Sequence, residues 1–84
     1  MTLQELRYAV ALAHHANFAR AAEACHVSAA TLSIQLKKLE EYLGAMLFDR
    51  SVRHVVPTAL GLEVVACARN MLAEAERIRE LARP

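Results

Sequence analysis

The chain has 84 residues, of which 56% are hydrophobic, and it contains two glycines and two prolines. This length suits one small, mostly helical domain. The formal net charge of +1 gives no basic surplus of the kind that non-specific DNA binders carry, and no apolar run approaches the roughly 20 residues of a membrane span. With no signal-peptide layout at the N-terminus, we expect a cytoplasmic protein.

Two helices are predicted in the first 25 residues. Thr2 and Glu5 form the pattern of a capping box, and a helix should run from there to about His15. Its apolar residues at helical spacing are Leu3, Leu6, Val10 and Ala13. A short second helix should begin after the cap residue Asn17. The residues that it can turn toward a core are Phe18, Ala21, Ala22 and Cys25.

A third helix is predicted after a three-residue turn, capped by Ser28 and ended by Gly44. Its buried stripe should be Leu32, Leu36, Leu39 and Leu43. Helices two and three then have the dimensions of a helix-turn-helix, in which the second helix offers its outer residues to the DNA major groove.

The outer face of this third helix carries the candidate reading residues. At about 100° per residue, the positions opposite the leucines are Ala30, Ile34, Lys37, Lys38 and Glu41, flanked by Thr31 and Ser33. Methyl groups can pack against thymine methyls, and hydroxyl groups can hydrogen-bond to base edges or phosphates. Lysines can pair with phosphates. The alternative is an ordinary amphipathic helix whose outer face meets water.

The stretch after Gly44 predicts a small two-stranded hairpin. The apolar pairs Leu47-Phe48 and Val55-Val56 enclose the polar segment "DRSVRH". A hairpin directly after a reading helix is a wing, whose tip would place Arg53 in or beside the minor groove. The alternative is a surface loop whose arginines pair with Asp49.

Thr58 should cap a final helix that runs to about Ala82. At 1.5 Å per residue it would span about 36 Å, more than so small a domain needs for its own core. Apolar and small residues repeat along it at intervals of four and three, as in a helix seam. This candidate dimerisation seam comprises Val64, Ala68, Met71, Ala75, Ile78 and Ala82.

The cysteines and histidines do not form a recognisable reactive site. Cys25 and Cys67 have no CxxC spacing, and the four histidines show no HExxH or comparable ligand pattern. We therefore expect no metal, no cofactor and no disulfide scaffold. No acid, base, nucleophile and oxyanion group can be assembled into one pocket, so an enzyme is not expected.

Four segments together resemble the DNA-binding domain of LysR-type transcriptional regulators, over essentially the whole chain. They are "RAAE" in the second helix, "VSxxTLSxQLKKLEEYLG" in the third, "LFDR" before the wing and "PTALG" at the start of the last helix. The turn "CHVS" and the segment "ARNML" are most similar to the peroxide-sensing, OxyR-like branch of that family.

The resemblance implies a mostly α-helical fold: a winged helix-turn-helix with a three-helix core and a two-stranded wing (residues 1–57), followed by a linker and dimerisation helix (residues 58–84). It implies a homodimer on double-stranded DNA at an interrupted A·T-rich dyad. It also implies a small-molecule or redox effector domain in the full-length protein, which this stretch does not include. The expected DNA-contact residues are Arg20, Ser28, Ala29, Ala30, Thr31, Ser33, Ile34, Lys37, Lys38, Arg50, Arg53 and His54.

The sequence departs from the family pattern on the reading helix. Ala29 and Ala30 stand where Gln-Pro is usual, and Ile34 stands where many members carry arginine. These changes remove a base-reading hydrogen bond and a phosphate or base contact, so specificity should lean on Thr31, Ser33, Arg53 and DNA shape. Exposed Ile34 and the near-neutral charge also suit a winged helix that serves as a protein-interaction or dimerisation module with weak DNA binding. Steep salt dependence would favour DNA.

Overall fold

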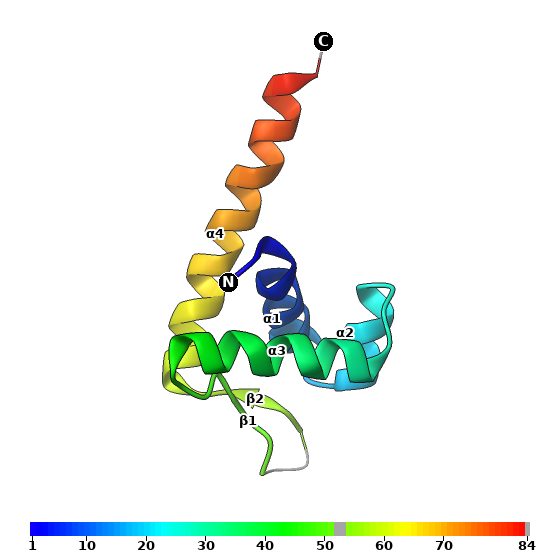
Figure 1. Ribbon diagram of the computed structural model, residues 1–84, viewed down its shortest axis with the longest axis vertical. Coiled ribbons are helices and arrows are strands. Elements are labelled where there is room, and N and C mark those ends of the chain that lie inside the picture. The colour runs from blue at the N-terminus through cyan, green and yellow to red at the C-terminus, as the bar shows by residue number, and fades with distance from the viewer. Residues whose placement is uncertain (52–53, 84) are drawn as a thin grey trace.

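The computed structural model describes residues 1–51 and 54–83. The described elements, in chain order, are α1 (Leu3–His15), α2 (Phe18–Ala24), α3 (Ala29–Leu43), β1 (Phe48–Asp49), β2 (Val56–Pro57) and α4 (Ala59–Ala82). In Figure 1, α3 crosses the front of the body, the two strands lie beneath it, and α4 extends away from the body. The predicted fold class, a winged helix-turn-helix followed by a long helix, is confirmed.

Each helix begins at the cap residue that the sequence predicts. Thr2, Asn17, Ser28 and Thr58 each accept a hydrogen bond from the backbone N–H three residues on. Such a bond satisfies one of the N–H groups that a helix start leaves without a partner. α3 ends at Gly44, whose φ of 70° is the left-handed conformation that glycine adopts readily.

The core lies where α1 packs against the other three helices. Its buried apolar residues are Leu6, Tyr8, Ala9, Leu12, Ala21, Ala22, Leu32, Leu36, Leu39, Leu47, Phe48, Val65 and Ala68. Three of the four predicted leucines of α3 are thus confirmed, but Leu43 is 38% exposed. It lies in the last turn of α3, at the edge of an open groove beside α4. Leu3, in the first turn of α1, is exposed as well.

The turn between α2 and α3 is one residue longer than predicted. α2 ends at Ala24, and Cys25 leaves the helical conformation with φ −94° and ψ 1°. His26 then takes a left-handed conformation with φ 59°, and the N–H of Val27 donates back to the carbonyl of Ala22. These bonds close the turn tightly enough for α3 to start at Ala29.

The wing is antiparallel, as predicted, but its strands lie one residue further along the chain. Phe48 pairs with Pro57 and Asp49 with Val56. Leu47 precedes β1 and lies opposite Thr58 in the same register, with its carbonyl accepting from the N–H of Thr58 at 2.9 Å.

α4 accounts for the 48 Å length of the molecule, because its C-terminal end extends away from the rest of the chain (Figure 1). Gly61, Val65 and Ala68 are buried in its first half, and no described residue of α4 after Ala68 is buried. Among the described residues, no helix combines the length and the apolar character that crossing a membrane requires.

Candidate nucleic-acid interface

The outward face of α3 is exposed along its whole length. Its N-terminal half presents the methyl groups of Ala29 and Ala30 and the side chain of Ile34, which is 56% exposed. The flanking residues Thr31 and Ser33 are exposed as well. Ile34 is thus a large apolar side chain turned to water on a helix whose opposite side buries Leu32, Leu36 and Leu39.

The hydroxyl groups at the start of α3 have different roles. The hydroxyl of Ser28 accepts from the N–H of Thr31 at 3.1 Å and donates to the hydroxyl oxygen of Thr31 at 3.0 Å. Ser28 is therefore engaged in the helix cap, whereas Thr31 keeps its own hydroxyl proton for an outside acceptor. Of these two predicted contact residues, only Thr31 has a hydrogen-bond donor to spare in its side chain.

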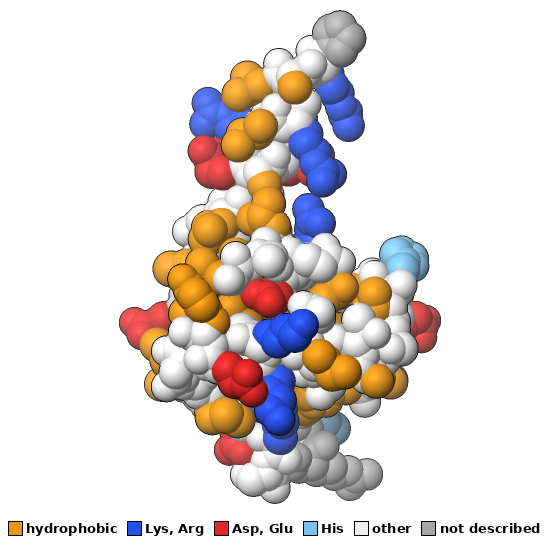
Figure 2. All heavy atoms as spheres, viewed as in Figure 1, with side chains coloured by type: hydrophobic (Ala, Val, Ile, Leu, Met, Phe, Trp, Pro, Cys, Tyr) orange, Lys and Arg blue, Asp and Glu red, His pale blue; other side chains and the backbone are white. Residues whose placement is uncertain are grey.

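The C-terminal half of the same face carries Lys37 and Lys38, both exposed. Figure 2 shows lysine, acidic and hydrophobic side chains close together on the side of the body that α3 crosses. Glu41, also exposed, lies one turn after Lys37 and reduces the local positive charge. The face is thus apolar toward its start and charged toward its end.

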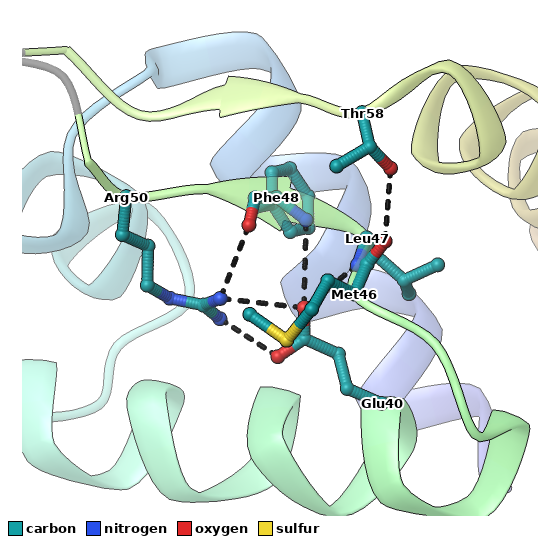
Figure 3. Close-up of polar contacts among 6 residues, drawn as sticks. All are labelled: Glu40, Met46, Leu47, Phe48, Arg50 and Thr58. Atoms are coloured by element: carbon teal, nitrogen blue, oxygen red, sulfur yellow. Dashed lines mark hydrogen bonds and ion pairs between the residues drawn. The ribbon is translucent and has the colours of Figure 1, made fainter.

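A buried carboxylate joins α3 to the wing. Glu40, 6% exposed, accepts from the backbone N–H of Leu47 at 2.8 Å and of Phe48 at 3.4 Å. Arg50 donates to both of its oxygens, at 2.9 and 3.3 Å, and to the carbonyl of Phe48 at 3.3 Å. Figure 3 shows the bonds from Leu47, Phe48 and Arg50 converging on the Glu40 carboxylate. Such two-pronged arginine–carboxylate bonding fixes orientation as well as distance.

Two further contacts hold the same corner. The guanidinium of Arg50 lies 5.7 Å from the ring centroid of Phe18 on α2, within cation–π range. Thr58, the cap of α4, donates its hydroxyl proton to the carbonyl of Met46 at 2.9 Å (Figure 3). The start of the wing is therefore tied to α2, α3 and α4 together.

Arg50 had been expected to contact DNA, but the structure directs its hydrogen bonds inward. Its side chain is only 30% exposed and is paired with Glu40. It therefore sets the position of the wing relative to α3. The alternative of a loop arginine paired with Asp49 is wrong for Arg50. Asp49 instead accepts from Ser51, through the hydroxyl at 2.6 Å and the backbone N–H at 2.8 Å, and these bonds hold the pKa of its carboxyl below the usual value.

The other predicted contact residues outside α3 are Arg20, Arg53 and His54. Arg20 is exposed on α2, beside His15 and Glu23 in a shallow polar pocket. His54 is exposed in the wing loop, and Arg53 lies outside the described residues.

The predicted seam of α4 divides into two parts. Ala68 is 1% exposed and packs in the core of its own chain, and Val64 is half-buried against the same core. Ala68 therefore serves mainly the core of its own chain, because the first half of α4 lies against α1. Further along, Met71 is 44% and Ile78 67% exposed. Ala75 is half-buried and Ala82 is exposed.

An open apolar groove continues this exposed stripe onto the body. Its apolar lining residues are Met1, Leu6, Leu43, Val64, Ala68 and Met71. A second hollow beside it is lined by Leu3, Met71, Ala75 and Ile78, with Asn70 and Glu74 at its polar part. Figure 2 shows hydrophobic side chains running from the body up along α4. Apolar patches of this kind are typical of protein interfaces.

Glu40 and Thr58 are the positioning residues that sequence reasoning missed. Thr58 was recognised only as a helix cap. Glu40 received no role in the sequence analysis, although it lies four residues after Leu36 and therefore on the buried side of α3. A carboxylate within a buried stripe is the signal that could have revealed it, since a buried charge requires partners.

Neither cysteine joins a cluster of ligands, and the described residues hold no group of three or more metal-binding side chains. Cys25 is half-buried, and burial raises the pKa of its thiol, an effect partly offset by Arg7. Cys67 is exposed, on the side of α4 that lines the apolar groove.

Comparison with known proteins gives a consistent result. Residues 3–62 match the family model described as "Bacterial regulatory helix-turn-helix protein, lysR family". The "Hydrogen peroxide-inducible genes activator" of Pectobacterium carotovorum subsp. carotovorum is 49% identical over 82 residues, which cover 98% of this chain and 27% of that protein. The chain thus spans about a quarter of the length of such relatives.

Solved structures agree. Full-length OxyR from Pseudomonas aeruginosa superposes with a TM-score of 0.95 at 54% identity, covering 98% of this chain and 28% of that one. The DNA-binding domain of BenM, in a complex with catB site 1 DNA, gives a TM-score of 0.93 at 32% identity, covering 96% of this chain and 90% of that one. The chain belongs to the LysR family of bacterial helix-turn-helix regulatory proteins.

Proposed function

We propose that this chain is the sequence-specific, double-stranded DNA-binding domain of a LysR-type transcriptional regulator. The observation that carries the proposal is the exposed outer face of α3, held at a fixed angle to the wing by Glu40 and Arg50. Family membership supports it, as does the likeness to a BenM domain solved with its DNA. Both favour DNA binding over the protein-interaction alternative.

In this proposal α3 lies in the major groove and the wing lies over the adjacent minor groove. The residues that face the bases are Ala29, Ala30, Ser33 and Ile34. They occupy the N-terminal half of α3, and in helix-turn-helix proteins this half of the recognition helix contacts the base edges. Lys37 and Lys38, further along the same face, reach the phosphates that border the groove.

Selection of duplexes from a random library at two salt concentrations tests the proposal. Enrichment of a two-fold sequence, with half-sites separated by about one or more helical turns, is the expected result. Salt-sensitive retention without any enriched sequence would contradict sequence-specific binding. Salt-independent retention would contradict phosphate contacts altogether.

Lys37→Ala provides a second test of the same geometry. We expect it to weaken binding to all duplexes alike and to lower the slope of log K against log salt by about one. Arg77→Ala is the matched control, because Arg77 lies on α4 and pairs with Glu74 at 3.5 Å. An unchanged slope for Lys37→Ala would place this lysine away from the phosphates.

We also propose that two copies associate through α4. The exposed Met71 and Ile78 and the groove beside them form a continuous apolar surface. The predicted division of the chain, residues 1–57 for DNA and 58–84 for dimerisation, is then modified in one respect. Residues up to Ala68 serve the core of the chain itself, so the seam rests on the exposed residues beyond it.

Charge placed on that surface tests the dimer. The double variant Met71→Glu/Ile78→Glu should be monomeric in analytical ultracentrifugation at concentrations where the unchanged chain is dimeric. Ala66→Glu/Ala73→Glu is the control, because at about 100° per residue these exposed positions lie on the opposite side of α4. If both variants sediment as dimers, the contact lies elsewhere.

For the whole protein, we propose an effector domain in the part that this chain does not span, and a cytoplasmic regulator of peroxide-inducible genes. The support is the 49% identity to a hydrogen peroxide-inducible genes activator. Fusing this chain to such a relative's remaining segment and measuring peroxide-dependent reporter expression would test it. An unresponsive fusion that still binds the selected duplex would contradict the peroxide assignment alone.

A further inference from the structure

The reading face of α3 offers few groups that can hydrogen-bond to a base edge. Ala29, Ala30 and Ile34 have neither donors nor acceptors in their side chains, and the hydroxyl of Ser28 is engaged in the cap. Only the hydroxyls of Thr31 and Ser33 remain in this half of the face. A face so composed reads sequence mainly by apolar contact.

Ile34 is the centre of that apolar contact. It is 56% exposed, with Ala30 one turn before it and Lys38 one turn after it. Its branched side chain projects further from the helix axis than the methyl of Ala30. With the lysines at the phosphates that border the groove, Ile34 points between them toward the groove floor.

The floor of the major groove presents one apolar group, the C5 methyl of thymine. Every other base edge there presents hydrogen-bond donors or acceptors, which an isoleucine would desolvate without replacing their bonds. We propose that Ile34, with Ala30, selects thymine in each half-site by packing against its C5 methyl. This inference rests on the proposed function, and it names the base feature that the altered reading helix recognises.

Replacing single thymines by deoxyuridine in the selected duplex removes only that methyl group. We expect one or two positions per half-site at which the affinity falls about fourfold, the equivalent of one buried methyl group. In the variant Ile34→Ala, thymine and deoxyuridine should bind equally at the position that Ile34 contacts. The exposed position of Ile34 leaves the fold intact, which circular dichroism of the variant checks.

The reverse comparison adds the methyl group instead of removing it. The same thymine is replaced by cytosine in one duplex and by 5-methylcytosine in another. 5-methylcytosine should bind about fourfold better than cytosine, because it restores the methyl group without changing the pairing edge. Leu62→Ala is the matched control, since Leu62 is 61% exposed on α4 and should leave both ratios unchanged.

The outcomes separate this inference from the function on which it rests. If a two-fold site is enriched but deoxyuridine has no effect at any position, or if Ile34→Ala keeps the same thymine preference, methyl reading by Ile34 is wrong while DNA binding stands. If no sequence is enriched, sequence-specific binding is overturned, and methyl reading with it.

Discussion

Replacing Glu40 with alanine should destabilise the protein far more than the same change at any exposed glutamate. The carboxylate accepts the N–H of Leu47 at 2.8 Å and both arms of the Arg50 guanidinium, in a position that is 6% exposed. Alanine removes all of these acceptors at once. The backbone N–H of Leu47, a residue that is 0% exposed, then loses its acceptor.

The magnitude follows from these contacts. An unsatisfied buried N–H costs about 1–3 kcal/mol, and breaking a buried ion pair by removing one partner costs about 3–5 kcal/mol. Arg50 is 30% exposed and can be hydrated once Glu40 is removed, so the cost of the broken ion pair lies toward the lower end of its range. We expect a loss of about 3 kcal/mol in the free energy of unfolding, a large fraction of the roughly 4–13 kcal/mol typical for a chain of this size.

Urea unfolding followed by circular dichroism measures this loss, at one fixed protein concentration because association shifts apparent stability. Glu41→Ala is the matched control: the residue is adjacent on α3, carries the same charge and is exposed. Arg50→Ala should cost less, about 1.5 kcal/mol, because Glu40 keeps its two backbone donors. Equal midpoints for Glu40→Ala and Glu41→Ala would refute the role of Glu40 as the joint between α3 and the wing.

Three further predictions follow from single features. Gly61→Ala should destabilise by about 3 kcal/mol in the same unfolding assay, because the added Cβ overlaps the carbonyl oxygen of Leu47, whereas Gly44→Ala should cost only about 1–2 kcal/mol for its φ of 70°. Ser51→Ala should raise the pKa of Asp49 toward its usual value in an NMR titration. In the chain without this substitution the pKa of Asp49 is lowered, so the charged carboxylate stabilises the folded state at neutral pH. That contribution is lost as the pH falls through the lowered pKa. Iodoacetamide at pH 8 should label exposed Cys67 before Cys25, whose pKa is raised by burial, and mass spectrometry of the peptides gives the order.

Elements fixed by local chemistry were predictable from the sequence. Each helix start depends on one cap side chain and on an N–H three residues away, so Thr2, Asn17, Ser28 and Thr58 could be recognised without knowledge of the fold. The end of α3 at Gly44 is of the same kind. The helix-turn-helix followed from these boundaries and from the leucine spacing between them.

The bounds of the wing strands could not be predicted to the residue, because each strand is only two residues long. Leu47 belongs to a run of apolar residues that reads as the start of a strand. Its side chain is drawn into the core and its carbonyl accepts from Thr58, which lies eleven positions later in the chain. This bond continues the register in which Phe48 pairs with Pro57, and the strands begin one residue later than the apolar pairs in the sequence indicate.

The stripe on α4 shows a second limit. Val64, Ala68, Met71 and Ile78 share one face by spacing, and spacing does not reveal what covers each position. α1 covers the first half of that face and buries Ala68, whereas Met71 and Ile78 lie beyond it and are exposed. The change from the chain's own core to the candidate interface therefore occurs beside the first turn of α1, and no pattern within α4 indicates this position.

On α3 the residues that hold the fold and those proposed to read DNA form separate sets. Leu32, Leu36, Leu39 and Glu40 face inward and fix the helix against α1 and the wing, while Ala30 and Ile34 have no role in the core. Ala30 replaces the usual proline without loss of the helix start, because the cap bond from Ser28 to the N–H of Thr31 is kept at 3.1 Å. The outer face can thus change its chemistry at little cost in stability. A regulator built in this way can exchange hydrogen-bonded base reading for methyl reading while the angle between α3 and the wing, set by Glu40 and Arg50, stays the same.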